Sequence, residues 1–171
     1  MAHPFILAIT GPAGSGKTTI GAKLASEIDK CVNIDADHFK HLIVNGFIYG
    51  DEDNAAGVSQ WELLGRNVGI VAKNFQEAGY NVIINGYINE PAWENIQKYV
   101  TLDHKILLLP HVDVVTRRDG GRDAEIQMGA EAVKKHHHYF SNASYYQDFL
   151  VMDSSEQDVE DTVAQIKEML L

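Results

Sequence analysis

One segment near the start of the chain restricts its fold more than any other. It reads Gly11-Pro12-Ala13-Gly14-Ser15-Gly16-Lys17-Thr18 and satisfies every fixed position of the pattern G-x-x-x-x-G-K-[ST]. An apolar run over 5–10 precedes it and a helix-like pattern over 20–25 follows it, which is the setting that the pattern requires. Glycines in such a loop turn successive N–H groups inward around an anion, and the helix beginning near Lys17 adds its positive end. The segment therefore predicts a binding site for a nucleoside triphosphate.

Each polar residue of the loop has an expected task. Lys17 can reach the β- and γ-phosphates, and the hydroxyl of Thr18 can ligate Mg²⁺. The alternative is a glycine-rich turn that matches by coincidence, and the agreement of spacing, position and flanks disfavours it. The candidate nucleotide-binding residues of this segment are Gly11, Ala13, Gly14, Ser15, Gly16, Lys17, Thr18 and Thr19.

Composition narrows the class of partner. The 171 residues are most simply one domain, residues 1–171. Lys and Arg number 14 and Asp and Glu 24, which gives a formal charge of −10. An acidic surface repels nucleic-acid phosphates and anionic membranes unless a local basic patch escapes the average. We therefore expect no nucleic-acid partner and no membrane partner.

The sequence lacks the features expected of an exported or membrane protein. Cys31 is the only cysteine, which excludes an internal disulfide and a cysteine-based zinc site. The N-terminus runs directly into the first expected strand, which leaves no room for a signal peptide, and no apolar run approaches membrane-spanning length. We expect a cytoplasmic protein.

Strands and helices alternate along the chain. Strands are expected over 5–10, 31–35, 81–85, 104–109 and 149–152. Helices are expected over 17–29, after the second strand, from a cap at Ser59 to a stop at Gly79, over 91–100, through 112–116, over 128–139, and from a cap near Ser155 to Leu170. The long helix carries apolar residues at Leu63, Leu64, Val68, Val71, Ala72 and Phe75. This order predicts an α/β fold, a parallel sheet with helices on both faces.

In such sheets ligands bind beyond the carboxyl ends of the strands. Of strands two, three and four, only the second ends in acidic residues, Asp35 and Asp37, because Asn85 and Pro110 follow the other two. A carboxylate near the metal and a carboxylate that receives a substrate proton are therefore most economically these two. The alternative is that either one caps the next helix, and a cap is compatible with a catalytic role.

A charged, glycine-containing segment over 117–127 is expected to form a lid. Arg118 and Arg122 lie four residues apart and share one face if the segment is helical. Arginines that close over a triphosphate neutralise the transferring group and exclude water. Gly120 and Gly121 would supply the hinge. The alternative is a solvated loop with internal Arg–Asp pairs.

Several classes of nucleotide-binding protein are excluded because their motifs are absent. The chain has no Asn-Lys-x-Asp guanine-reading motif, and no strand ends in the acidic pair with which a motor-type ATPase polarises water. The reaction that remains possible is the transfer of a phosphoryl group to a bound hydroxyl.

At this point the chain resembles the small phosphate-loop kinases of metabolites, such as shikimate kinase, gluconate kinase and chloramphenicol phosphotransferase. The resemblance runs from Phe5 to about Ser155 and rests on the loop, the acidic end of strand two, and the lid motif Arg117-Arg118-Asp119-x-x-Arg122. The runs 127–129 and 151–154 also look like those of bacterial phosphate-loop proteins described as gluconate kinases or as proteins of unknown substrate. At Met128-Gly129 the chain lacks the arginine that often follows in these relatives.

The resemblance implies a sheet of order 2-3-1-4-5, ATP with Mg²⁺, a mobile lid, and a monomer. It matches Asp37 to the carboxylate that orients or deprotonates the acceptor hydroxyl, and Asp35 to the one near Mg²⁺. Adenine would lie between Arg118 and the loop after strand five, at Asp153 and Ser154.

The acceptor is expected over the sheet, under a helical region spanning about 38–78. Its candidate contacts are His41, Tyr49, Trp61, Arg66, Asn85 and Tyr87, each of which also suits packing or an exposed surface. The anion-binding arginines of shikimate kinase have no clear counterpart, since Arg66 is the only arginine before the lid. The sequence therefore does not identify the acceptor.

Two aromatic or histidine-rich stretches receive structural interpretations. The run His136-His137-His138 cannot converge on one metal ion from a helix, because consecutive side chains point about 100° apart, so a solvated face is favoured. Trp93 and the cluster Tyr139, Phe140, Tyr145, Tyr146 and Phe149 are expected in the core.

The sequence thus favours an ATP-dependent kinase of a small-molecule hydroxyl, with Lys17, Asp37, Arg118 and Arg122 as catalytic residues. Two alternatives stay open. One is a kinase of a nucleotide-sugar or of a polynucleotide 5′-hydroxyl, against which the negative charge counts when the substrate is nucleic acid. The other is a non-catalytic, ATP-gated binding protein.

Overall fold

Five parallel strands form the centre of the molecule. The computed structural model describes residues 3–48 and 54–170. The strands are β1 (Ile6–Thr10), β2 (Cys31–Asp35), β3 (Asn81–Asn85), β4 (His104–Leu108) and β5 (Leu150–Met152). They pair in the order β2-β3-β1-β4-β5, as the resemblance implied. The predicted fold class, a phosphate-loop α/β sandwich, is therefore confirmed.

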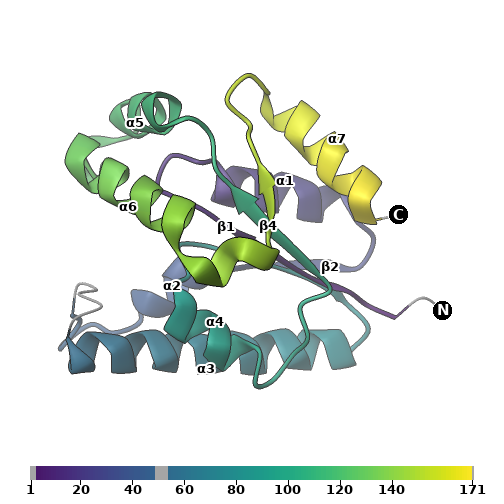
Figure 1. Cartoon of the computed structure of the whole chain (residues 1–171). Helices are drawn as coiled ribbons and strands as arrows, with labels where there is room; N and C mark the ends of the chain where they lie inside the picture. The colour runs from purple at the N-terminus through teal and green to yellow at the C-terminus, as the bar shows by residue number, and fades with distance from the viewer. Residues whose placement is uncertain (1–2, 49–53, 171) are drawn as a thin grey trace.

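Helices cover both faces of the sheet. They are α1 (Lys17–Glu27), α2 (Ala36–Lys40), α3 (Ala55–Glu77), α4 (Glu90–Ile96), α5 (Val112–Gly120), α6 (Ala130–Asn142) and α7 (Val159–Leu170), with short 3₁₀ turns at Ala124–Ile126 and Ser144–Asp148. In Figure 1, α3 and α4 lie along one side of the sheet and α1 and α7 along the other, with α6 crossing the end of the first side. Two helical layers thus enclose the sheet.

Alternate residues of each strand pack into two separate hydrophobic cores, because successive strand side chains point to opposite faces of the sheet. Ile6, Ala8 and Ile84 face the core beneath α3 and α4. Leu7, Ile9 and Ile83 face the core beneath α1 and α7. These strand residues are fully buried, which explains why the strands read as continuous apolar runs.

Two predicted helix caps are wrong. The long helix α3 begins at Ala55, where the side chain of Asn54 accepts a hydrogen bond from the Ala56 N–H, so Ser59 lies inside the helix. Ser155 does not cap α7, which begins at Val159, because its N–H and its hydroxyl both bond to Asp153. Asp158 caps α7 instead, because its Oδ1 accepts a hydrogen bond of 2.8 Å from the Asp161 N–H.

The predicted aromatic core is confirmed. Trp93, Phe140, Tyr146 and Phe149 are buried, and Tyr139 and Tyr145 pack partly buried against them. Of the apolar residues predicted on one face of α3, Leu63 and Phe75 are exposed, because the buried stripe follows the small residues that contact α4. Within the described residues, none of the helices combines the length and the apolar content needed to cross a membrane.

Candidate active site

The loop between β1 and α1 has a backbone that only glycine adopts without strain. Gly14 and Gly16 have φ values of 79° and 93°, and Gly11 has 148°. A Cβ at Gly11 would lie 2.2 Å from the carbonyl oxygen of Leu108, and one at Gly14 would lie 2.4 Å from that of Val115. The glycines are therefore required both by conformation and by the close approach of β4 and α5.

The loop delivers the chain into a helix whose first turn has N–H groups to offer. Gly16 is the N-cap of α1 and supplies no side-chain acceptor, so the first-turn N–H groups lack an intrahelical partner. The hydroxyl of Ser15 is buried and has no hydrogen-bond partner among residues 3–48 and 54–170. Ala13 lies half-buried in the loop and Thr19 lies exposed on the first turn. These features fit a bound phosphate chain.

Lys17 is buried and lies among the other predicted catalytic groups. Its Nζ donates a hydrogen bond of 2.8 Å to the carbonyl of Pro12. Burial lowers its pKa to about 8, against the opposing effects of the Asp37 and Asp35 carboxylates, while Arg122 lowers it further. Because each of these charges acts on Lys17, the fold brings the loop, the end of β2 and the lid segment together.

Asp35 caps α2 and also contacts the hydroxyl of Thr18. Its Oδ1 accepts a hydrogen bond from the Asp37 N–H at 3.0 Å, which caps α2. Its Oδ2 accepts from the hydroxyl of Thr18 at 3.4 Å. Carboxylate and hydroxyl oxygens are the ligands that Mg²⁺ prefers, so this pair fits the metal site that the sequence predicts.

Asp37 is oriented by the loop after β3. Its Oδ2 accepts a hydrogen bond from the Tyr87 N–H at 3.3 Å. Gly86 makes this approach possible, because its φ is 147° and a Cβ there would lie only 3.2 Å from the Cβ of Ala36. The Asp37 carboxylate is thereby held on the side of Lys17 where an acceptor would lie.

The lid segment is organised by a carboxylate that sequence reasoning gave no role. Arg117 to Gly120 belong to α5, and Asp119 is only 1% exposed. The Asp119 carboxylate accepts from the N–H groups of Met128 and Gly129 at 3.0–3.2 Å and pairs with Arg122 at 3.4 Å. It fixes the turn between α5 and α6 and holds Arg122 near Lys17. The only sequence signal was its place between the two arginines.

Arg118 points to the loop after β5. Its guanidinium donates a hydrogen bond of 3.0 Å to the carbonyl of Ser154. Asp153 lies in the same loop, and its pKa is lowered by hydrogen bonds from Ser155. The predicted adenine-binding residues are thus neighbours in space, although they are far apart in sequence.

Three predicted acceptor contacts lie elsewhere. His41 packs its ring against Phe47, and Arg66 forms an exposed pair with Glu62 on α3. Asn85 is buried, donates to Asn33 at 2.8 Å and lies against Gly21 of α1, so it joins strands on the opposite face of the sheet. Tyr49 lies outside the described residues.

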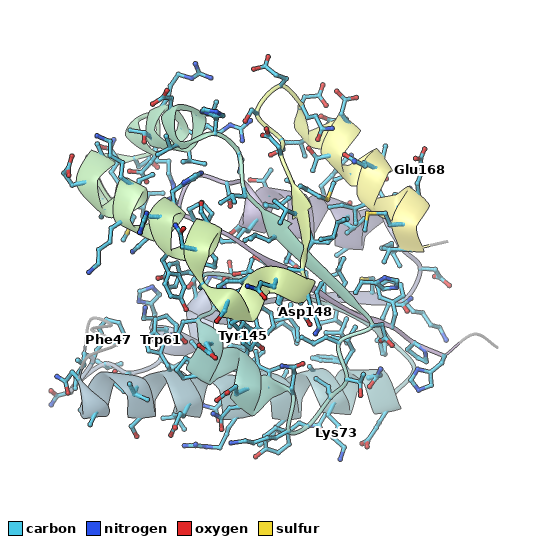
Figure 2. The ribbon with its side chains drawn as sticks, viewed as in Figure 1. Phe47, Trp61, Lys73, Tyr145, Asp148 and Glu168 are labelled. Carbon is cyan, nitrogen blue, oxygen red and sulfur yellow. The ribbon has the colours of Figure 1, made fainter. Side chains whose placement is uncertain are left out.

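Tyr87 instead contacts a group of rings from two helices, α3 and α6. Its ring lies 5.8 Å from Trp61 of α3, 4.6 Å from His136 of α6 and 5.2 Å from Phe140, measured between centroids. Figure 2 shows Trp61 and Phe47 where α3 approaches the side chains of α6. Lys40 adds a positive charge 3.9 Å from the Trp61 ring centroid. Sequence reasoning missed Lys40 and His136, because neither belongs to a recognisable motif.

The histidine run is not a uniformly solvated face, so that prediction is wrong for two of its members. His136 is partly buried against Tyr87, and its Nδ1 is buried without a hydrogen-bond partner among the described residues. His137 is 2.9 Å from the carbonyl of Pro110 through its Nε2. Only His138 is exposed. Helical rotation directs each ring into a different environment.

The comparison with protein families places this site in a known group. Residues 1–106 match the family model described as Zeta toxin, and they make up more than half of the 171-residue chain. The chain belongs to the Zeta toxin family. The part that matches the family contains the glycine loop, Asp35, Asp37 and Tyr87, whereas the lid and α6 lie beyond it. A search of curated proteins found no match.

Solved structures share the fold over nearly the whole chain. A sugar kinase from Janibacter sp. HTCC2649 is 18% identical with a TM-score of 0.73, covering 98% of this chain and 94% of its own. A tunicamycin resistance protein from Deinococcus radiodurans is 16% identical with a TM-score of 0.70, covering 98% and 95%. A shikimate kinase from Bacteroides thetaiotaomicron is 19% identical with a TM-score of 0.62, covering 97% and 98%. The resemblance to small phosphate-loop kinases is therefore confirmed at the level of the fold.

Proposed function

We propose that this member of the Zeta toxin family is a kinase that moves the γ-phosphoryl group of ATP to a hydroxyl of a small-molecule acceptor. The observation that carries the proposal is the bond from Thr18 of the glycine loop to Asp35, which in turn binds the N–H of Asp37 at the end of β2. The names of the structural neighbours, a sugar kinase and a shikimate kinase, agree with this class of reaction.

The loop and α1 would hold the phosphates. First-turn N–H groups of α1 and the Lys17 ammonium face the same concavity, so they can bind the β- and γ-phosphates together. Thr18 and, through water, Asp35 would hold Mg²⁺, which when bound neutralises charge on the phosphate oxygens. Lys17 would exchange its bond to Pro12 for one to phosphate.

Asp37 would act on the acceptor. The Tyr87 N–H fixes one of its oxygens, which orients the carboxylate toward an incoming hydroxyl. The carboxylate accepts the hydroxyl proton as the oxygen bonds to phosphorus, and the β-phosphate oxygen leaves with ADP. The Asp37 charge acts on Lys17, so the two residues lie close enough for one acceptor and one phosphate group to meet between them.

The segment over 117–127 would close the site. Arg122 would neutralise the transferring group, and Arg118 with Asp153 and Ser154 would border the adenine. Closure would exclude water, which otherwise competes with the acceptor. Asp119 would hold Arg122 in place.

The test is ADP release with Mg·ATP against pooled sugars, sugar acids, nucleosides and antibiotics, followed by the mass of the product. We expect one pool to raise ADP release well above the rate with water and to gain one phosphate. Lys17→Ala should abolish turnover, whereas Asp37→Asn should retain ATP binding and lose at least about a hundredfold in kcat.

Asp29→Asn is the matched control, since Asp29 is exposed at the opposite end of β2. Full kcat in Asp37→Asn would refute the role of Asp37. ATP binding with no acceptor-stimulated ADP release would instead favour an ATP-gated binding protein.

A further inference from the structure

Lys40 is a partly buried positive charge that the proposed transfer reaction does not use. It follows Asp37 by three residues on α2, so the two side chains share one face of that helix. Its pKa is lowered by burial, and the Asp37 carboxylate opposes that shift. Within residues 3–48 and 54–170, no carboxylate lies within ion-pair distance of its Nζ.

Aromatic rings hold this ammonium in place. It lies 3.9 Å from the centroid of the Trp61 ring and 5.7 Å from that of Phe47. The loop that carries Phe47 is fastened to α3 by Gln60, which donates to the Gly46 carbonyl at 2.7 Å and accepts from the Ile48 N–H at 2.9 Å. Cation–π contact offsets part of the cost of burying a charge and leaves the N–H donors available to an anion.

His136 approaches the same place from α6. Burial lowers its pKa, and the positive charges of Lys17, Lys40 and Lys135 lower it further, while Asp119 opposes them. Its ring packs 4.6 Å from that of Tyr87, whose N–H binds Asp37. The Nδ1 of His136 is buried without a hydrogen-bond partner among the described residues, so a neutral imidazole can bond to a ligand atom there without adding charge.

We propose that Lys40 and His136 bind a negatively charged group of the acceptor, a carboxylate or a phosphate, while its hydroxyl faces Asp37. The inference rests on the proposed function, because it divides one acceptor between these residues. Asp37 and Lys40 are about one helical turn, roughly 5 Å, apart, so the two groups of the acceptor belong to one small ring or short chain. Trp61 and Tyr87 provide the surface on which its apolar face rests.

A cavity beside this group leaves room for a larger acceptor. It has a volume of about 230 Å³, lies between α2 and α3, and shares Lys40 and Trp61 with the ring group. Asp37, Tyr87 and His136 do not line it, so it continues away from the reacting end. Its other walls are mainly apolar, including Phe39, Ile43 and Leu64. An acceptor of this class can therefore carry an apolar substituent beyond its anionic group.

The binding test uses the protein with its nucleotide site saturated by Mg·ADP, so that added anions cannot enter the glycine loop. Inorganic phosphate, acetate and uncharged glucitol are titrated separately while the indole N–H signal of Trp61 is followed by NMR. We expect phosphate or acetate, and not glucitol, to shift that signal in a saturable way. The stronger of the two anions identifies the charged group as phosphate or carboxylate.

Variants decide whether Lys40 and His136 are responsible. Lys40→Met should weaken anion binding about tenfold or more, and Lys40→Arg should restore most of it. His136→Phe retains a ring beside Tyr87 but no nitrogen, and should weaken binding several-fold, with partial rescue by His136→Gln. Lys73→Met is the control, since Lys73 is exposed near the opposite end of α3, as Figure 2 shows. Unchanged Mg·ADP binding shows that each variant is folded.

Each outcome separates this inference from the proposed function. No saturable anion shift, or a shift that Lys40→Met leaves intact, overturns the anionic subsite, even if a neutral acceptor is phosphorylated. A Lys40-dependent shift without phosphorylation of any acceptor retains the subsite and refutes the kinase. If both the anionic subsite and the kinase activity are found, kcat/KM should be higher for glucose 6-phosphate or gluconate than for glucose or glucitol. Lys40→Met should remove that preference, chiefly by raising KM.

Discussion

A buried lysine beside two carboxylates and an arginine responds to pH and to ligand together. Lys17 is 8% exposed, and burial is the largest cause of its lowered pKa of about 8. The ordinary pKa of a lysine is 10.5, so in the folded protein without nucleotide Lys17 releases its proton at a lower pH than an exposed lysine does. Phosphate groups favour the charged form, so nucleotide binding should return the proton to Lys17.

This linkage predicts a pH dependence of nucleotide affinity. Below about pH 8, Lys17 is already protonated and affinity should be nearly constant with respect to this group. Above it, binding requires proton uptake, so affinity should fall as pH rises, by at most about tenfold per pH unit. Calorimetry of Mg·ATP binding at pH 7, 8 and 9, in buffers of different ionisation enthalpy, measures both the affinity and the proton uptake.

Lys17→Met should bind weakly and lose this pH dependence, whereas Lys23→Met, which changes an exposed lysine of the same helix, should retain it. Equal affinity and no proton uptake across the range would contradict the assignment of Lys17.

At the scale of elements, one carboxylate joins α5, the lid and α6. Asp119 pairs with Arg122 and also accepts the first N–H groups leading into α6, which carries His136. A change at Arg122 therefore has a direct physical route, through Asp119, to the start of α6. This coupling does not need the Gly120-Gly121 hinge that the sequence suggested, although Gly120 has open space around it.

Removing the charge of Asp119 should loosen this junction. In Asp119→Asn the amide N–H groups would face the N–H groups of Met128 and Gly129, and Arg122 would lose its partner. We expect a loss of about 3 kcal/mol in the free energy of unfolding, because the N–H groups of Met128 and Gly129 lose the buried carboxylate that accepts from them. Urea unfolding and amide hydrogen exchange over residues 128–133 measure it.

Asp123→Asn, at an exposed position of the same segment, should change stability by less than about 0.5 kcal/mol. Protection at the start of α6 that is unaltered in Asp119→Asn would mean that the junction is held by something else.

The contact between α3 and α4 depends on one small residue. A Cβ at Gly65 would lie 2.2 Å from the carbonyl oxygen of Ala92 and 2.8 Å from the Cβ of Asn95. Gly65→Ala should therefore destabilise the protein by about 2 kcal/mol or more, although alanine favours helices, because the two helices must separate. Thermal unfolding compares it with Gly120→Ala, where a Cβ meets nothing and stability should not fall.

At the scale of the whole molecule, the negative overall charge contrasts with the balanced charges of the candidate site. The chain carries −10, whereas Lys17 and Arg122 lie among the carboxylates of Asp35, Asp37 and Asp119. A small anion can reach such a site, whereas a polyanion meets the repulsive surface around it.

Two properties of the protein in solution can be predicted. A fluorescent 20-nucleotide single strand should show no binding in 0.15 M salt by anisotropy, and sedimentation should give a monomer of about 19 kDa. Tight oligonucleotide binding would instead support the polynucleotide-kinase alternative. Lys30→Glu, which changes an exposed lysine away from the loop, is the control for any weak residual signal.

The bounds of some helices and strands could be predicted from the sequence, and those of others could not. The bounds predicted for β2 and β3 are those of the structure, because each is a short apolar run between clear breaks. The starts of α3 and α7 were missed, since Asn54 and Asp158 accept from the first-turn N–H groups that Ser59 and Ser155 were expected to satisfy. Caps depend on competition among neighbouring polar side chains, which a local pattern does not resolve.

The sequence by itself determined the glycine loop, the alternation of strands and helices, and the acidic end of β2. Each is local: the loop needs glycine at fixed spacing, and strand burial needs consecutive apolar residues. Only the tertiary structure decided that Asn85 and Arg66 lie away from Asp37, that Asp119 holds the turn between α5 and α6, and that Lys40 lies over Trp61 while His136 packs against Tyr87. Residues separated by nearly a hundred positions become neighbours only when strand order and helix rotation are fixed, because both depend on packing throughout the chain.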